Sequence, residues 1–141
     1  MTEAVNPGKP TPEPTLVSAP FWAGAAEGKF LIQQCKKCGA KQHYSRPFCT
    51  SCLAQDLVWV ETSGRATLYS FTVVRRAATK AFETSLPYVL GIMELGEGPH
   101  VTGNVVGCKP EDVRVGMPLE LVIEHREGPD GAIPQWQPVG E

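Results

Sequence analysis

The sequence predicts a mainly β protein built from a short N-terminal helix, a zinc ribbon and a five-stranded barrel of the OB-fold type. Two observations lead to this prediction. Four of the five cysteines form two C-x-x-C pairs in the first half of the chain. From residue 64 onward, short runs of β-branched, leucine and aromatic residues alternate with turn residues. The 141 residues leave room for one ordinary domain, or for a metal module plus a compact domain.

The two cysteine pairs predict a structural zinc site. The ligands would be Cys35, Cys38, Cys49 and Cys52. Each short loop can aim two thiolates at one ion, and two loops complete the closed tetrahedral shell that zinc prefers. Such a site has no open position for a substrate, so the ion would stabilise the fold. Iron held in the same way and a pair of disulfides remain alternatives.

The residues around the cysteines describe a small metal module. Residues 30–35 form a predicted strand that leads into the first metal loop, and residues 57–60 can pair back against it. Gly39 follows the first pair, where a positive φ turns backbone N–H groups toward the sulfurs, whereas Leu53 follows the second. A module of this size has little core, so the ion should supply most of its folding free energy, on the order of 10 kcal/mol.

The N-terminal region divides into a tail and a helix. Residues 1–17 are rich in proline and are predicted to be a disordered tail. Residues 18–62 form the helix and the metal module, and Ser18 and Gly28 suit the two ends of the helix. So short a helix cannot bury both Phe21 and Trp22 by itself. These two aromatic residues are therefore candidates for a partner interface, unless the metal module covers them.

Residues 63–141 are predicted to form the barrel. The expected strands are residues 67–74, 88–95, 101–106, 119–124 and 133–137. Residues 96–99 and 128–131 supply turn chemistry, and residues 110–113 have the pattern of a short helical turn between the third and fourth strands. Five strands with such a link after the third suggest an OB-fold, whose closure removes exposed sheet edges.

Composition and charge disfavour several classes of protein. The net charge of −2 provides no polycationic surface for nucleic acid. No basic segment followed by an apolar run opens the chain, and no stretch approaches the ~20 apolar residues that span a bilayer. We therefore expect a cytoplasmic protein that binds neither a membrane nor nucleic acid. A nucleic-acid module remains an alternative, because Tyr69 and Phe71 could stack bases; packing in the barrel core accounts for them better.

Several stretches together resemble a known family, the acyl-CoA-associated proteins that join a rubredoxin-like zinc ribbon to an OB-fold. The resemblance covers about residues 21–138. The similar stretches are Phe21-Trp22 with Gly28, Cys35-x-x-Cys38-Gly39, Arg46-Pro47-x-Cys49, and residues 63–74, 86–89, 94–98 and 115–117. The resemblance implies a non-catalytic accessory subunit that assembles with a thiolase-superfamily enzyme as a hetero-oligomer. It also implies that the chain binds or covers the CoA part of the substrate.

An independent catalytic site is hard to assemble from these residues. Cys108 is the one cysteine outside the pairs, and it lacks a local basic or helix-terminus signal that would lower its pKa. His43, between the cysteine pairs, is expected to be a polar loop residue, and His100 and His125 are expected to be structural or surface residues. Any reaction would then belong to a thiolase, acyltransferase or aldolase partner. An iron-loaded electron carrier is a further alternative to this reading.

The candidate CoA-binding residues lie in one loop. They are Arg75, Arg76, Lys80 and Phe82, which follow the first barrel strand. Cations in a loop at the barrel mouth could meet the phosphates of CoA. We expect this loop to form the lip of a CoA channel together with Phe21 and Trp22.

Overall fold

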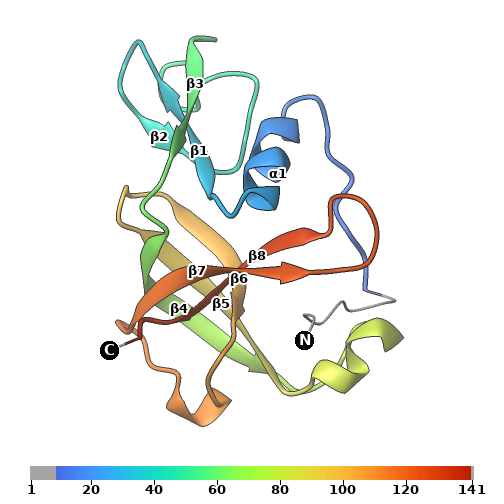
Figure 1. Ribbon diagram of the computed structural model, residues 1–141. Helices are drawn as coiled ribbons and strands as arrows, with labels where there is room; N and C mark the ends of the chain where they lie inside the picture. Colours follow the sequence, from blue (N-terminus) through green and yellow to red (C-terminus); the bar gives the residue numbers. More distant parts are fainter. Residues whose placement is uncertain (1–8, 141) are drawn as a thin grey trace.

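The structure of the protein, a computed structural model, describes residues 9–140 (Figure 1). Its N-terminal part consists of the helix α1 (Ala19–Ala26) and a small antiparallel sheet. The sheet has the strand order β2-β1-β3, formed by β1 (Leu31–Cys35), β2 (Lys41–Gln42) and β3 (Leu57–Glu61). Strand β3 pairs with β1 along its whole length, from Leu31 opposite Glu61 to Cys35 opposite Leu57. The predicted pairing of the two halves of the module is confirmed.

The rest of the chain forms a closed five-stranded barrel with the order β4-β5-β6-β8-β7. The strands are β4 (Arg65–Val74), β5 (Tyr88–Leu95), β6 (His100–Val105), β7 (Pro118–His125) and β8 (Ala132–Pro138). Two 3-10 turns, η1 (Lys80–Ser85) and η2 (Pro110–Asp112), connect β4 to β5 and β6 to β7. The barrel closes where β6 and β8 pair in parallel at Val105 and Trp136. The predicted fold class, with its helix, cysteine cluster and barrel, is confirmed.

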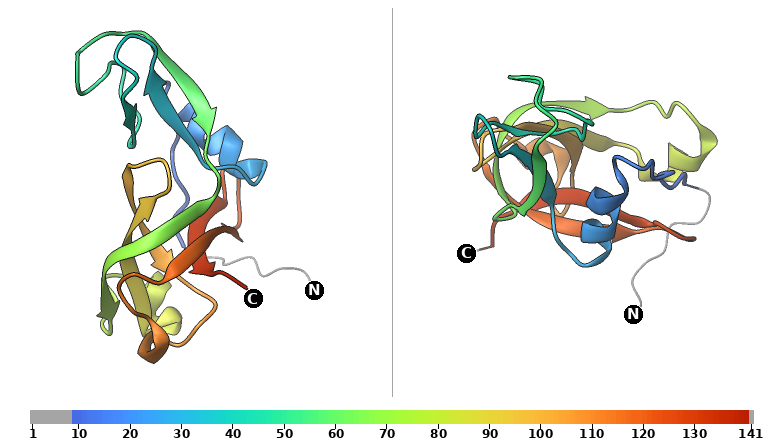
Figure 2. Two further views of the ribbon diagram at one scale, coloured as in Figure 1. Left: turned by 90° about the vertical axis from the view of Figure 1, so that its left-hand side faces the viewer. Right: turned by 90° about the horizontal axis from the view of Figure 1, so that it is seen from above.

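One hydrophobic core joins the metal module to the barrel. Phe30, at the start of the module, is buried and its ring centroid lies 5.6 Å from that of Trp136 in the barrel. Phe21 of α1 completes the row, because its ring lies 5.1 Å from that of Phe30. At the junction the Thr62 hydroxyl donates a hydrogen bond of 2.8 Å to the Phe30 carbonyl. Packed aromatic rings therefore join the module to the barrel. Figure 2 shows from two further sides that the module lies at one end of the barrel.

Residues 9–17, which we call the N-terminal strap, run from the far end of the barrel past the β7–β8 hairpin to α1 (Figure 1). The guanidinium of Arg126 donates a hydrogen bond of 2.7 Å to the Pro10 carbonyl. The Lys9 ammonium lies 3.8 Å from a Glu124 carboxylate oxygen. The composition of residues 1–17 predicted a tail without such contacts. Residues 1–8 of that tail lie outside the described residues.

Two local details differ from the expectations. The Ser18 hydroxyl does not cap α1; instead it accepts a hydrogen bond of 2.9 Å from the Thr15 N–H, because Ser18 itself adopts helical angles. In β4 a bulge between Leu68 and Ser70 breaks the alternation of faces. Tyr69 continues the exposed series of Arg65 and Thr67, and its ring lies 4.5 Å from that of His100. After the bulge, Phe71 turns inward and packs against the core. The predicted packing in the barrel core is confirmed for Phe71 and wrong for Tyr69.

No helix within residues 9–140 has the length and apolar character needed to cross a lipid bilayer.

Candidate functional site

The four paired cysteines converge on one point at the tip of the metal module. Their sulfur atoms all lie within 4.8 Å of one another. The Sγ atoms of Cys35 and Cys52 are 3.7 Å apart, and those of Cys38 and Cys49 are 3.6 Å apart. A tetrahedral ion with metal–sulfur bonds of about 2.3 Å requires sulfurs about 3.8 Å apart, so the cluster fits a tetrathiolate ion. A disulfide needs sulfurs about 2 Å apart, so these close pairs are not disulfides.

The two metal loops repeat the same backbone hydrogen bonds. In the first loop the Gly39 N–H donates to the Cys35 carbonyl, and in the second the Leu53 N–H donates to the Cys49 carbonyl, both at 2.9 Å. The φ angles of Gly39 and Leu53 are 81° and 67°, so both residues adopt the left-handed conformation. The prediction for Gly39 is confirmed. Leucine takes the same conformation in the second loop despite the steric cost of its Cβ.

Backbone N–H groups point at the sulfurs and favour their ionised form. The N–H groups of Cys52 and Ser51 lie 3.5 and 3.3 Å from the Cys49 sulfur. These contacts lower the pKa of the Cys49 thiol to about 6. The backbone N–H of Cys38 likewise lowers the pKa of Cys35. The pKa of Cys38 is instead raised to about 11, because the backbone N–H of Ala40 is outweighed by hydrogen bonds with the neighbouring thiols and by burial. The backbone thus favours the metal-binding thiolate form at Cys35 and Cys49.

Two buried glutamines hold the loop between the cysteine pairs, and the sequence analysis did not identify them. Gln33 accepts hydrogen bonds from the Arg46 N–H at 2.9 Å and from the Gln42 amide at 2.8 Å. Gln42 in turn accepts from the Thr50 N–H at 2.9 Å. Residues 43–50 have no strand or helix of their own, so these side chains satisfy their backbone groups. The glutamines thus set the distance between the two metal loops.

A cavity of about 540 Å³ opens where α1, the metal module and the barrel meet, and we call it the junction cavity. Trp22 of α1, His43 and Arg46 of the module, and Leu90, Gln135 and Trp136 of the barrel all line it. Trp22 is half-buried there, whereas Phe21 is 8% exposed and belongs mainly to the core. Of the two predicted interface residues, Trp22 is thus the one that a partner could reach.

His43 is part of this junction and is not a simple polar loop residue. Its ring lies 5.4 Å from that of Phe21, 5.2 Å from that of Phe30 and 4.0 Å from that of Tyr44. Burial, together with the charge of Arg46, lowers the pKa of His43 to about 4. The imidazole is therefore neutral at physiological pH and serves as an aromatic packing group.

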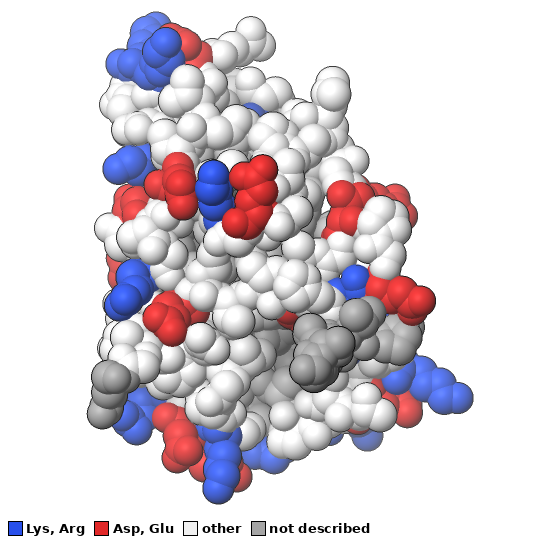
Figure 3. All heavy atoms as spheres, in the orientation of Figure 1, with Lys and Arg blue, Asp and Glu red and all other residues white. Residues whose placement is uncertain are grey.

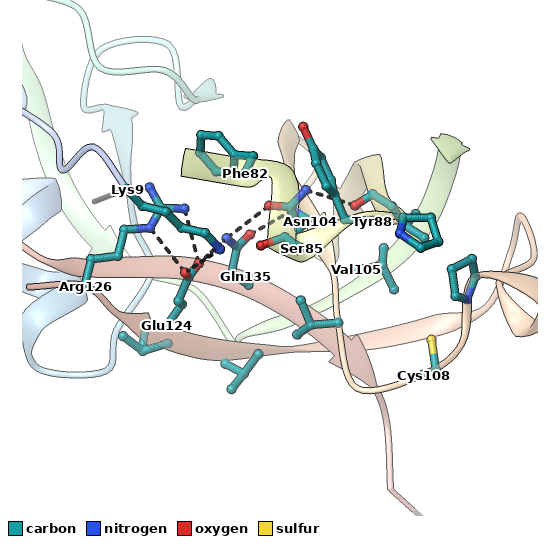
Figure 4. A pocket seen from close by; sticks show the side chains of 16 residues that line it. Lys9, Phe82, Ser85, Tyr88, Asn104, Val105, Cys108, Glu124, Arg126 and Gln135 are labelled. Atoms are coloured by element: carbon teal, nitrogen blue, oxygen red, sulfur yellow. Dashed lines mark hydrogen bonds and ion pairs between the residues drawn. The ribbon is translucent and has the colours of Figure 1, made fainter. Parts of the chain in front are cut away.

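A second cavity of about 420 Å³ lies beneath the N-terminal strap, and we call it the strap cavity (Figure 4). Of the predicted CoA-binding residues, Phe82 lines it, whereas Arg75, Arg76 and Lys80 are exposed in the loop after β4. Phe21 and Trp22 line the junction cavity instead. The structure therefore does not bring the loop and the helix together at one cavity. The two cavities adjoin, because the same three residues line both of them: Asn104, Arg126 and Gln135.

Cys108 and His100 have different surroundings. Cys108 is half-buried near η2, and burial, with the charge of Asp112, raises the pKa of its thiol. His100 lies on the outer face of the barrel, 3.9 Å from a Glu94 carboxylate oxygen. On the face shown in Figure 3, the lysines and arginines are interspersed with acidic residues. These features do not resemble a thiol–imidazole catalytic pair or a basic nucleic-acid surface.

Comparison with known families and proteins yields consistent matches. Residues 22–58 match the ChsH2 rubredoxin-like zinc ribbon domain, and residues 59–124 match the ChsH2 C-terminal OB-fold domain. The chain is 41% identical over 116 residues to a DUF35 domain-containing scaffold protein of Methanocaldococcus jannaschii, covering 79% of this chain and 82% of the relative.

Two further matches concern enzyme complexes. A probable enoyl-CoA hydratase alpha subunit of Thermomonospora curvata is 34% identical over 120 residues, which is 84% of this chain and 36% of that subunit. The solved structure of an Ltp2-ChsH2(DUF35) aldolase superimposes with a TM-score of 0.80 at 31% identity, covering 90% of this chain and 98% of the matched chain. Together with the cysteine cluster and the barrel, these matches show that the chain belongs to the DUF35 family of ChsH2-type zinc-ribbon and OB-fold proteins.

Proposed function

We propose that this chain is a non-catalytic, zinc-binding accessory subunit of a thiolase-like acyl-CoA enzyme complex. The junction cavity carries the proposal, because the helix, the metal module and the barrel all contribute to it and leave Trp22 half-buried at its wall. The relatives add support. One is named a scaffold protein, one a hydratase subunit, and one belongs to an aldolase with Ltp2.

In this proposal the junction cavity forms part of an acyl-CoA channel that the partner completes. Its lining combines apolar side chains with the cations Arg46 and Arg126. Such a lining suits a ligand with both an apolar arm and anionic groups. The exposed Arg75, Arg76 and Lys80 would contact phosphates of the same ligand. Catalysis would belong to the partner, because the raised pKa of Cys108 keeps that thiol protonated.

The metal is zinc in this proposal, and its role is to hold the module in shape for assembly. Four thiolates suit zinc and iron equally in geometry, so metal analysis of the purified protein distinguishes them. A colourless protein with one zinc per chain is the expected result. A coloured protein containing iron would instead favour an electron carrier. Reduced thiolates also fit the cytoplasm, where thiols stay reduced.

Co-purification tests the assembly. The tagged chain should retain an acyl-CoA enzyme from its own organism, identified by mass spectrometry, and Trp22→Ala should reduce that retention at least tenfold, since buried aromatic residues dominate interface energies. Tyr69→Ala is the matched control, because Tyr69 is an exposed aromatic residue that lies on the barrel and not on α1. Equal retention by both variants would contradict a role for Trp22, and retention of no acyl-CoA enzyme would contradict the proposed function.

Steady-state kinetics of the complex test the contribution of the loop. Reversal of the charges of Arg75 and Arg76 to glutamate should raise KM for acyl-CoA while leaving kcat nearly unchanged, because a lost phosphate contact weakens binding without touching the reacting atoms. Arg114→Glu is the control, since Arg114 is an exposed cation elsewhere on the barrel. An unchanged KM would remove this loop from the channel.

A further inference from the structure

The strap cavity has an apolar floor and one charged end. Its apolar lining includes Val89, Val105, Val122, Ile123 and Phe82. Figure 4 shows Lys9, Glu124 and Arg126 gathered at one end, whereas Val105 and Cys108 lie toward the other. The volume of about 420 Å³ lies within the range of small-molecule sites. A ligand that fits it would need an apolar body and a polar head at one end.

The charged end holds two cations and one carboxylate among the described residues that line the cavity. The side chains of Lys9, Arg126 and Glu124 are 14%, 11% and 19% exposed. Glu124 accepts hydrogen bonds of 3.2 and 3.3 Å from Arg126 and lies 3.8 Å from the Lys9 ammonium. A shielded cation in excess is costly unless an anion balances it. One additional negative charge would therefore complete this end of the cavity.

Arg126 and Lys9 have N–H donors that form no hydrogen bond among the described residues. Arg126 uses one hydrogen on each of its three nitrogens, to Glu124 and to the Pro10 carbonyl. A guanidinium carries five N–H donors, so two remain, and the Lys9 ammonium has three donors of its own. Both cations lie over the Phe82 ring, with Lys9 Nζ 5.3 Å and Arg126 Cζ 5.8 Å from its centroid. The Phe82 ring thus contacts both cations at the charged end of the cavity.

The two amide side chains in the cavity wall, those of Asn104 and Gln135, are already paired. The Gln135 amide donates to Glu124 at 2.8 Å and to Asn104 at 3.2 Å, while its oxygen accepts from the Asn104 N–H at 2.8 Å. The Asn104 amide donates to the Val89 carbonyl at 3.0 Å. These groups are held in place without a ligand. Selectivity for the head group of a ligand would therefore come from the two cations, Lys9 and Arg126.

We propose that the strap cavity is a binding site for a small amphipathic monocarboxylate. Its hydrocarbon part lies on the valines, and its carboxylate accepts hydrogen bonds from Lys9 and Arg126. A monoanion matches the single excess positive charge. Because Lys9 belongs to the N-terminal strap, binding also fastens the strap to the barrel. The site lies away from the cysteine cluster and adjoins the junction cavity, with which it shares Arg126, whereas Lys9 lines the strap cavity and not the junction cavity. The proposal does not depend on assembly with an acyl-CoA enzyme.

Titration of the full-length, metal-loaded chain with octanoate tests the proposal, followed by the amide NMR signals of Val105 and Ile123. Saturable binding to these residues is expected, whereas octylamine, which has the same chain and a positive head, should not bind. Octan-1-ol should bind at least tenfold more weakly than octanoate, because it lacks the charge-assisted hydrogen bonds. Equal binding of octylamine or octan-1-ol would overturn the proposal.

Variants assign the site to its residues. Lys9→Gln and Arg126→Gln should each weaken octanoate binding about tenfold, whereas Arg114→Gln should leave it unchanged. Lys9 lies on the strap, so its replacement keeps the test valid even if Arg126→Gln disturbs the hairpin. Unchanged affinity of the Lys9 variant would overturn the proposal. Displacement of octanoate by CoA, or shifts centred on the Trp22 indole, would also overturn it, because either result would place the ligand in the proposed acyl-CoA channel.

Discussion

At the scale of single residues, the environment of His43 matters more than its chemical type. In the sequence it is a histidine between two pairs of metal ligands, which suggests a polar role. In the structure it packs among the rings of Phe21, Phe30 and Tyr44. Burial among these rings favours the neutral imidazole over the charged one.

The first prediction concerns the pH dependence of stability. The pKa of His43 is lowered to about 4 in the fold, from 6.5 for the ordinary residue. As the pH falls below 6.5, the unfolded chain gains a proton that the folded chain excludes, so stability falls until the pH reaches about 4. Between pH 6.5 and 5 the loss from this residue should be about 1.5 kcal/mol.

Replacement of His43 by phenylalanine should remove this part of the pH dependence. Urea unfolding of the metal-loaded protein at pH 6.5 and pH 5 measures the effect, and His125→Gln, at an exposed histidine, is the control. The comparison between variants cancels the effect of acid on the metal site. An identical pH dependence for His43→Phe and the unchanged protein would contradict the prediction.

At the scale of elements, the two metal loops have one geometry and different sequences. Gly39 adopts its left-handed angles without steric cost, whereas Leu53 adopts nearly the same angles with a side chain that is 70% exposed. The Leu53 side chain contributes little buried surface in return. The second loop is therefore strained by its residue type, not by its backbone path.

The second prediction follows from this comparison. Leu53→Gly should stabilise the module by about 0.5–1 kcal/mol, because it removes a left-handed cost of ~1–2 kcal/mol and adds some unfolded-state entropy. Gly39→Ala should destabilise it by a similar amount, and the cause would be the backbone alone, since a Cβ there meets no atom within 4 Å. Chelator titration followed by circular dichroism measures both. A destabilising Leu53→Gly would refute the argument.

At the scale of the whole molecule, the metal module and the barrel depend on each other. The rings of Phe21 and Phe30 connect α1 and β1 to Trp136 in the barrel. A disturbance at the cysteines therefore reaches the junction cavity, where Trp22 lies. The barrel has its own closed hydrogen bonding and its own buried residues, so it need not follow the module when the metal is lost.

The third prediction is that removal of the metal unfolds the module and leaves the barrel folded. The bound ion should contribute on the order of 10 kcal/mol to a sheet of three short strands. Hydrogen exchange after chelation should show lost protection in β1 and β3, and retained protection in β5 and β6. Unchanged protection of β1 in protein shown by mass spectrometry to be metal-free would contradict this.

Local signals explain what could be predicted. The spacing of the cysteines, the positive φ of Gly39 and the strand at Tyr88–Leu95 each depend on a few neighbouring residues. Gln33 and Gln42 could not be found in this way. Their partners lie up to 13 residues away in the chain, and an amide side chain has no periodic pattern. The bulge after which Phe71 turns toward the core likewise arises from pairing with β5.

The sequence by itself determined the cysteine cluster, the fold class and the succession of strands along the chain, because spacing and alternation are properties of neighbouring residues. The tertiary structure decided which groups share a cavity. It placed Trp22 and His43 at one cavity, and Lys9 and Phe82 at another. Residues such as Lys9 and Arg126 are 117 positions apart in the chain, and only the closure of the barrel and the path of the strap bring them to one aromatic ring.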